Sequence, residues 1–465
     1  MAGKKPKIER GSFRRTLAVS LAGARAGGAL AIDGAWAKLR PGQDGSGPLE
    51  SEFARREARR FVAELGRLKG TYVKIGQMLA LLGEHFLPPV LTEALHELES
   101  GTEALLWEDI ESHVREALGE RYAELIIDQH AIAAASLSQV HRATIAASGE
   151  QICLKIQYPG LAELIDTDFD TVVRMLLIAR WIKSGRELDA WLEFLREQLH
   201  REMDYQLEGQ MTDQVAQLVQ SCAGENSELG FSYYVPQRHQ RYCTDTILAL
   251  EYIDGFAVTR TEVAAMSQSR RNALGRAMLE LFFYELYQWG VLQTDPNFGN
   301  YLIRSQGEQD ELVLLDFGSM LPCDEHLLIH LGNAIAASQA EDREIVLEGL
   351  IGLGCLKEDA STEAKATLTE LCLQLGEPLR ESEHQPAEYL NARGEYCWSR
   401  SQLTRRVGKM AANSAFTKHF TTPSRQFAMI ARKLTGVYTF IVVIDAQFNA
   451  ADIVRRHTER WLERS

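Results

Sequence analysis

The spacing of apolar residues near the N-terminus predicts a helix over residues 61–82. Its apolar residues recur every three or four positions and therefore share one face of an α-helix. They are Phe61, Leu65, Leu68, Tyr72, Ile75, Leu79 and Leu82. At about 100° per residue, Lys74 and Gln77 lie together on the opposite face, with Gly70 between them. A solvated polar face is the ordinary explanation of such a pair, so the pattern by itself predicts only a helix packed on a hydrophobic partner.

The remaining pattern is rich in helices, with a few short strands in the middle of the chain. Helical spacing covers residues 51–120, 161–220, 257–290 and 324–465. Short apolar or alternating runs predict strands at 138–158, 231–235, 246–252 and 311–315. The apolar run 436–446 is too short to span a bilayer and contains Asp445, so it predicts a buried core helix. Together these patterns predict an α+β fold in which helices predominate.

The segment 290–319 carries the most specific chemistry. Asp295 is followed five positions later by Asn300, then by a strand-like run, and then by Asp316 in an Asp-Phe-Gly triplet. Kinase-type phosphoryl transfer uses one Asp for the nucleophile, and an Asn and a second Asp to hold Mg²⁺ against the ATP phosphates. A polar turn followed by a strand end is the alternative, but chance seldom supplies this whole ordered set. The segment predicts Asp295 as catalytic and Asn300 and Asp316 as metal ligands.

A kinase-like site also needs an upstream lysine and a glutamate partner. Residues 151–156 form an apolar strand that carries the single lysine Lys155, and the helical run from Leu188 reaches Glu202. A lysine on an edge strand can instead block aggregation, and a helical glutamate can simply face solvent. Because both stand in the kinase order ahead of the two aspartates, we predict a Lys155–Glu202 ion pair that orients Lys155 on the α- and β-phosphates.

Several standard kinase motifs are missing. No G-x-G-x-x-G precedes Lys155, and its place is taken by the alanine-rich stretch 131–140. Alanine restricts φ where glycine would not, so we predict an altered nucleotide cradle formed by Ala133, Ala134, Ala135 and Ser136. There is also no H-R-D and no A-P-E, and the chain runs from D-F-G almost directly into a helical pattern. The missing activation loop argues against phosphorylation of protein substrates.

These motifs together identify a family. The chain resembles the UbiB/AarF/ADCK family of atypical protein-kinase-like proteins over about residues 55–345. The matching motifs are K-x-G-Q (Lys74, Gly76, Gln77), A-A-A-S at 133–136 followed by Q-V-H-R-A, L-K-I-Q-Y-P-G around Lys155, E-x-D-Y-x-x-E (Glu202, Asp204, Tyr205, Glu208), L-E-Y-I-D-G, T-D-P-N-F-G-N and D-F-G.

The resemblance implies a protein-kinase-like two-lobed fold that binds Mg-ATP between its lobes, with an N-terminal K-x-G-Q helical extension. In that family the extension covers the place where a protein kinase takes its peptide. We therefore assign regulatory roles to Lys74, Gln77 and Glu208, and expect Lys74 and Gln77 to face Asp295 and Asp316. The family is tied to ubiquinone and other isoprenoid-lipid metabolism, often at membranes.

Two departures from the family pattern affect the catalytic loop. Gln293 stands near the place where the family commonly has a histidine, and the loop reads D-P-N-F-G-N instead of D-P-H-P-G-N, with Asn297 and Phe298. Asp295 and Asn300 are kept, so metal and nucleotide chemistry are expected to be intact. The changes put in doubt the loop surface that faces the third substrate.

Length and charge set the domain plan and exclude some partners. The 465 residues divide into a basic, flexible segment (1–50), the K-x-G-Q extension (51–125), a kinase-like N-lobe (126–255) and a helical C-lobe (256–465). A net charge of −14 argues against nucleic-acid binding and confines any contact with anionic lipid to local patches. For residues 1–40 the alternatives are a flexible tail, which we favour, a membrane-touching surface helix, or a secretory signal, which Arg25 disfavours.

These observations predict a cytoplasmic, ATP-dependent atypical kinase or ATPase with Mg²⁺ as cofactor, peripheral at the inner membrane surface when it contacts lipid. Its expected partners are ATP and isoprenoid lipids or quinone-biosynthesis proteins, with the phosphoryl acceptor left open. A nucleotide-binding scaffold with negligible turnover is the alternative, and a true protein kinase is disfavoured. Retention of Asp295, Asn300 and Asp316 favours the enzyme, since a scaffold has no need of all three.

Overall fold

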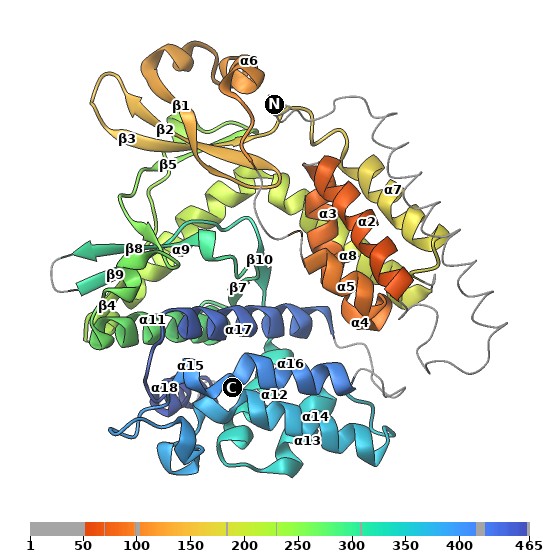
Figure 1. The fold of residues 1–465 in the computed structure, drawn as a ribbon. Coiled ribbons are helices and arrows are strands. Elements are labelled where there is room, and N and C mark those ends of the chain that lie inside the picture. Colours follow the sequence, from red (N-terminus) through yellow and green to blue (C-terminus); the bar gives the residue numbers. More distant parts are fainter. Residues whose placement is uncertain are drawn as a thin grey trace. The chain divides into compact units, whose positions relative to one another are not determined.

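The computed structural model divides the chain into two compact units (Figure 1). It describes residues 52–462 apart from 69, 97, 99–102, 183–184, 229, 307–308 and 415–423. Of the described residues, those up to Gly209 and Arg238–Tyr252 form the first unit, and Gln210–Gln237 and those from Ile253 onward form the second. The predicted basic segment 1–50 lies outside the described residues.

The first unit contains a group of packed helices. They are α2 (Glu52–Leu68), α3 (Thr71–Ala80), α4 (Gly83–Phe86), α5 (Pro89–His96), α7 (Ile165–Ile178) and α8 (Arg186–Met203). Helix α3 packs against α2, α5, α7 and α8, and all seven residues of the predicted apolar stripe are buried. The prediction of one continuous helix over 61–82 is wrong, because the chain turns at Gly70 with φ of +62°, in the left-handed region that favours glycine.

A four-stranded antiparallel sheet completes the first unit, next to helix α6 (Trp107–Leu118) and the 3₁₀ turn η2 (Gly119–Glu124). Its order is β1 (Leu125–Ala134), β2 (Ser138–Ile145), β3 (Gln151–Gln157) and β5 (Ile247–Glu251), with the 3₁₀ turn η3 (Gln240–Tyr242) before β5. The strands predicted at 138–158 and 246–252 are confirmed. Strand β1 was not predicted, because it lies at the sheet edge and buries only Leu125, which leaves no apolar alternation.

The second unit begins within helix α9 (Tyr205–Glu228) and contains two small sheets. In the larger, β4 (Phe231–Tyr234) runs parallel to β9 (Gln309–Leu314), followed by β8 (Tyr301–Gln306) and β6 (Phe256–Ala257). In the smaller, β7 (Val291–Gln293) pairs with β10 (Met320–Pro322). The predicted strands at 231–235 and 311–315 are confirmed within one or two residues.

The core of the second unit is built around α11 (Gln268–Tyr287), in which every residue from Ala277 to Tyr287 is buried. The other helices are α10 (Thr261–Ala264), α12 (Glu325–Gln339), α13 (Arg343–Gly352), α14 (Thr362–Leu375), α15 (Trp398–Ser401), α16 (Leu403–Ser414), α17 (Arg425–Val443) and α18 (Ala451–Leu462). Helices α17 and α18 pack on α11. Most of the run 436–446 lies in α17 with a buried apolar side, as predicted.

Helix does not fill the C-terminal part as completely as predicted. In residues 376–397 the helical elements are limited to the short 3₁₀ turns η5 (Glu377–Leu379), η6 (Ser382–His384) and η7 (Ala387–Tyr389). Pro378 and Pro386 explain the difference, because proline lacks the amide donor that a continuing helix needs. Among the described helices, none combines the length and the apolar character needed to cross a membrane.

Two helical glycines give a matched test of the packing around α11. A Cβ added at Gly275 would lie 2.8 Å from Ala446 Cβ and 2.9 Å from Phe448 Cε1, whereas a Cβ added at the exposed Gly408 of α16 would meet nothing within 4 Å. We expect Gly275→Ala to lower the free energy of unfolding by about 1–3 kcal/mol through overpacking. Gly408→Ala should raise it by about 0.5–1 kcal/mol, because alanine favours helix. Thermal or urea denaturation of both variants checks this, and equal effects would contradict the packing described.

Candidate functional site

Lys155 is held by a buried carboxylate in the first unit. It lies on β3, opposite Val140 of β2 and Leu248 of β5. Its Nζ donates to Glu208 Oε1 at 2.6 Å, and the Glu208 side chain is only 1% exposed. Nζ also lies 5.4 Å from the centre of the Tyr205 ring. The pair fixes the direction of the lysine, because a buried carboxylate without a cation would be costly.

The prediction that Lys155 pairs with Glu202 is therefore wrong. Glu202 Oε2 lies 2.5 Å from Lys74 Nζ, so the two glutamates serve two different lysines. The two pairs differ from the prediction because a helix ends between the two glutamates, which the hydrophobic pattern does not reveal. Helix α8 ends at Met203, and Asp204 caps α9 by accepting a hydrogen bond from the Leu207 amide at 2.9 Å. Glu202 and Glu208 therefore stand on separate helices, α8 and α9.

The two polar residues of the K-x-G-Q helix stand out from their neighbours. Every residue of α3 except Lys74 and Gln77 is buried, which confirms that these two share the more open face. Lys74 is held by Glu202, while Gln77 Nε2 donates to the Leu98 carbonyl at 3.1 Å. The expected direction of this face, toward Asp295 and Asp316, stays a prediction.

The alanine-rich loop is a tight hairpin between β1 and β2. Ala133 and Ala134 pair with Val140 and Gln139, so the loop proper is shorter than the predicted 131–140. The Ala135 amide donates to the Ser138 carbonyl at 2.8 Å and closes the turn. Ala133 and Ala135 are exposed, whereas Ser136 is buried. The hairpin thus presents small side chains and backbone at its tip.

The predicted catalytic loop of the second unit joins β7 to β8 through the short turn η4 (Phe298–Asn300). Asn300 Nδ2 donates to the Asp295 carbonyl oxygen at 3.1 Å and to Asp295 Oδ2 at 3.3 Å. Asn297 supports the turn by accepting from the Gly299 amide at 2.9 Å. The two residues predicted to act together, Asp295 and Asn300, are therefore in direct contact.

The Asp-Phe-Gly segment is tied to this loop at both ends. The Leu315 amide donates to the Asn300 carbonyl at 3.0 Å, and the Thr294 amide donates to the Ser319 carbonyl at 2.9 Å. The Thr294 and Ser319 hydroxyls lie 2.9 Å apart, and both residues are buried. Asp316 Oδ1 accepts from the Gly318 amide at 3.0 Å. The residues predicted for metal and nucleophile are thus built into one hydrogen-bonded arrangement.

Asn300 and Asp316 offer the oxygen donors that Mg²⁺ prefers. The amide nitrogen of Asn300 is used within the loop, so its amide oxygen is the atom offered to a metal. In the part of the chain that the structure describes, no three His, Cys, Asp or Glu side chains cluster as a metal-binding group. Two oxygen donors fit an ion that takes its remaining ligands from water and phosphate, as Mg²⁺ usually does.

Two cationic side chains near the loop, Arg432 and Lys433, were not predicted from the sequence. Arg432 of α17 places Nη2 3.7 Å from Asp295 Oδ1. Lys433 beside it is 1% exposed and bonds to residues at both ends of the loop. The sequence does indicate that Lys433 is buried, because it occupies a position in the apolar stripe of α17, between Ile430 and Val437. No sequence pattern links either residue to a loop more than 130 positions earlier.

Comparison with known proteins gives the same family as the motifs. A family model described as the ABC1 atypical kinase-like domain matches residues 97–350. The probable serine/threonine-protein kinase abkA of Dictyostelium discoideum is 26% identical, over 86% of this chain and 70% of that protein. The mitochondrial atypical kinase COQ8 of Saccharomyces cerevisiae is 28% identical, over 69% and 62%. The mitochondrial atypical kinase coq-8 of Caenorhabditis elegans is 25% identical, over 87% and 51%.

The chain spans between about half and seven tenths of the length of these relatives. The fold has a solved counterpart in a structure titled the complex of Rv3197 and erythromycin from Mycobacterium tuberculosis. The similarity covers 87% of this chain and 96% of that one, with a TM-score of 0.58 and 21% sequence identity. The predicted helix-rich, kinase-like α+β fold is thereby confirmed. Because the family model covers more than half of the sequence, this chain belongs to the ABC1 atypical kinase-like family, the family of the UbiB, AarF and COQ8 proteins.

Proposed function

We propose that this protein binds Mg-ATP and cleaves its terminal phosphoanhydride bond, as an atypical kinase or ATPase serving isoprenoid quinone or lipid metabolism. One observation carries the proposal. The loop with Asp295 and Asn300 and the segment with Asp316 are joined by hydrogen bonds at both ends, which keeps all three polar side chains in a common arrangement.

Each residue then has a chemical task. Lys155, oriented by Glu208, would donate to the α- and β-phosphates. Asn300 and Asp316 would hold Mg²⁺, which neutralises charge on the phosphates when bound. Asp295 would accept the proton of the attacking hydroxyl or water while the new O–P bond forms and the bond from Pγ to the bridging oxygen breaks. ADP leaves with that oxygen, so the step is balanced by one proton transferred to Asp295.

A small or lipid-borne acceptor is favoured over a peptide. In protein kinases an activation loop follows the Asp-Phe-Gly triplet and docks the substrate. Here Met320–Pro322 pairs with β7 immediately after it, and α12 begins at Glu325. The link to quinone or other isoprenoid lipid rests on the family resemblance. Peripheral contact with lipid belongs to the same proposal.

A nucleotide-binding scaffold is the second candidate. The observation that favours it is the Arg432–Asp295 ion pair, since Arg432 Nη2 lies 3.7 Å from Asp295 Oδ1 and occupies space that an attacking group would need beside that carboxylate. An ATPase assay with and without lipid vesicles, on the wild type and on Asp316→Asn, tests the proposal. Turnover that falls in the variant supports the enzyme. Binding of Mg-ATP without turnover in either condition would leave the scaffold as the function.

Metal binding and proton transfer can be separated by three substitutions. Asp316→Asn and Asn300→Ala should each reduce the rise in melting temperature that Mg-ATP produces, because a metal ligand is lost. Asp295→Asn should keep that rise but lower turnover by roughly 10²–10⁴-fold, the usual contribution of a general base. Differential scanning fluorimetry and a phosphate-release assay measure the two effects. An undiminished ligand shift in Asp316→Asn would contradict the metal assignment.

The Lys155–Glu208 pair should behave as one unit. We expect Lys155→Met and Glu208→Gln each to weaken nucleotide binding, and the double variant to be no worse than the poorer single variant. Glu111→Gln, which removes an exposed pair with Arg115 at 2.8 Å, serves as the control and should leave affinity unchanged. Titration of a fluorescent ATP analogue gives the affinities. Additive losses would show that the two residues act independently.

The alanine-rich hairpin should influence nucleotide affinity more than stability. Glycine at Ala133, Ala134 or Ala135 frees φ at the backbone proposed to cover the phosphates. Ala147→Gly in the exposed turn between β2 and β3 is the matched control, since it loosens a hairpin of the same sheet at its other end. Fluorescent nucleotide titration and thermal melts of the four variants provide the comparison. If the three hairpin variants bind as the control does, the hairpin does not cover the nucleotide.

A further inference from the structure

Helix α17 buries a charged lysine in the core of the second unit. Lys433 is 1% exposed, and its Nζ donates to Glu285 Oε1 at 3.3 Å, to Gln293 Oε1 at 3.0 Å and to the Tyr301 hydroxyl at 3.0 Å. An ammonium group has three protons to donate, and three different residues accept here. The side chain is therefore fully engaged inside the protein.

The partners of Lys433 mark both ends of the proposed catalytic loop. Gln293 is the last residue of β7 and Tyr301 is the first of β8, so the segment between them carries Asp295 and Asn300. Glu285 belongs to α11, the central helix of the unit. One side chain thus ties the beginning and the end of the loop to the most buried helix.

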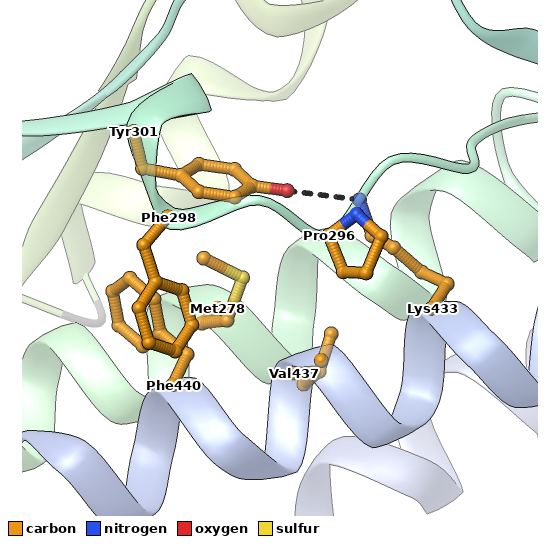
Figure 2. Close-up of a pocket in the computed structure, with 8 residues that line it drawn as sticks. Met278, Pro296, Phe298, Tyr301, Lys433, Val437 and Phe440 are labelled. Carbon is orange, nitrogen blue, oxygen red and sulfur yellow. Dashed lines mark hydrogen bonds between the residues drawn. The ribbon is translucent and has the colours of Figure 1, made fainter. Parts of the chain in front are cut away.

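The same face of α17 contacts the loop at further points (Figure 2). A Cβ added at Gly436 would lie 2.1 Å from Pro296 Cβ, so only glycine allows this close approach. The Phe298 and Phe440 rings meet edge to face, with centres 6.1 Å apart. Positions 433, 436 and 440 are three or four residues apart and share one helix face. The loop therefore rests on α17 along its length.

A purely stabilising role would not require a charge at this place. Burial by itself lowers the pKa of Lys433, but the Glu285 carboxylate and the Tyr301 hydroxyl outweigh it, so the net pKa is raised and the ammonium persists. Apolar side chains of similar volume often replace buried ion pairs with no loss of stability. What an apolar side chain cannot supply is the directed hydrogen bonds to Gln293 and Tyr301.

We propose that Lys433 is the positioning residue of the catalytic loop. It acts through Gln293 and Tyr301, holding both ends of the loop so that Asp295 and Asn300 keep their mutual geometry. It does not itself act on the reacting atoms. The expected loss of turnover when Lys433 is replaced rests on the proposed function. The expected loss of order in the loop does not.

The test measures hydrogen–deuterium exchange of residues 294–300 in the full chain, with amides of α11 as the reference for global opening. In Lys433→Met we expect loop exchange to be faster by at least about tenfold, as when one hydrogen bond to a charged group is lost. Tyr301→Phe removes one of the three acceptors and should produce a smaller change of the same kind. Ile441→Ala is the control, because Ile441 is a buried residue of α17 whose side chain points toward Gly275 of α11.

A double variant separates positioning from simple charge balance. Lys433→Met/Glu285→Met removes the buried carboxylate as well, and should recover melting temperature while the loop still exchanges fast. Phosphate release should fall in both Lys433 variants, with a smaller change in affinity for Mg-ATP.

Wild-type loop exchange in Lys433→Met, or restored loop protection in the double variant, would overturn the proposal. So would equally fast loop exchange in Ile441→Ala. If the wild type shows no turnover, the proposed function fails, and the exchange data alone decide whether Lys433 positions the loop.

Discussion

The hydrogen bonds between the Asp295–Asn300 loop and the Asp-Phe-Gly segment are the constraint on which the proposed site of the second unit depends. Thr294 and Ser319 join the segments on one side, and Asn300 and Leu315 join them on the other. These groups are largely withdrawn from water, where an unmade hydrogen bond is costly. The bonds therefore resist displacement, and the polar side chains that they carry stay at fixed positions relative to one another.

A second constraint, of a different kind, organises the lysines of the first unit. Glu202 and Glu208 are only six residues apart, but the helix break at Asp204 places them on two different helices. Each then meets its own lysine, one from α3 and one from β3. The helix boundary decides which lysine each carboxylate meets, and for the buried Glu208 that cation is needed because an unpaired buried charge is costly. The helix break at Asp204 thus places one carboxylate beside Lys74 of α3 and the other beside Lys155 of β3.

The residues that depart from the family pattern in the proposed catalytic loop contact side chains of α17. The side chain of Gln293 accepts from Lys433, and the Phe298 ring packs on Phe440. An amide oxygen and an aromatic ring at these positions are satisfied by a cation and a second ring on the same helix. The loop and α17, although far apart in sequence, therefore pack together as one structural element.

The sequence by itself determined the family, the kinase-like fold class, the buried stripe of 61–82 and most strands, because motif order and hydrophobic periodicity are local properties of the chain. It also placed Asp295 and Asn300 together, since five residues in a tight loop cannot separate far. It missed the edge strand β1, which has no apolar alternation, and it assigned Lys155 to Glu202 because the pattern did not reveal where α8 ends.

Tertiary structure alone decided the partner of Lys155, the turn at Gly70 and the contacts of α17 with the proposed catalytic loop. Each depends on the direction of an element after a break, or on the approach of segments more than a hundred residues apart. A charged group that becomes buried must be paired, and its partner is the group that packing brings next to it. Sequence separation does not predict that partner.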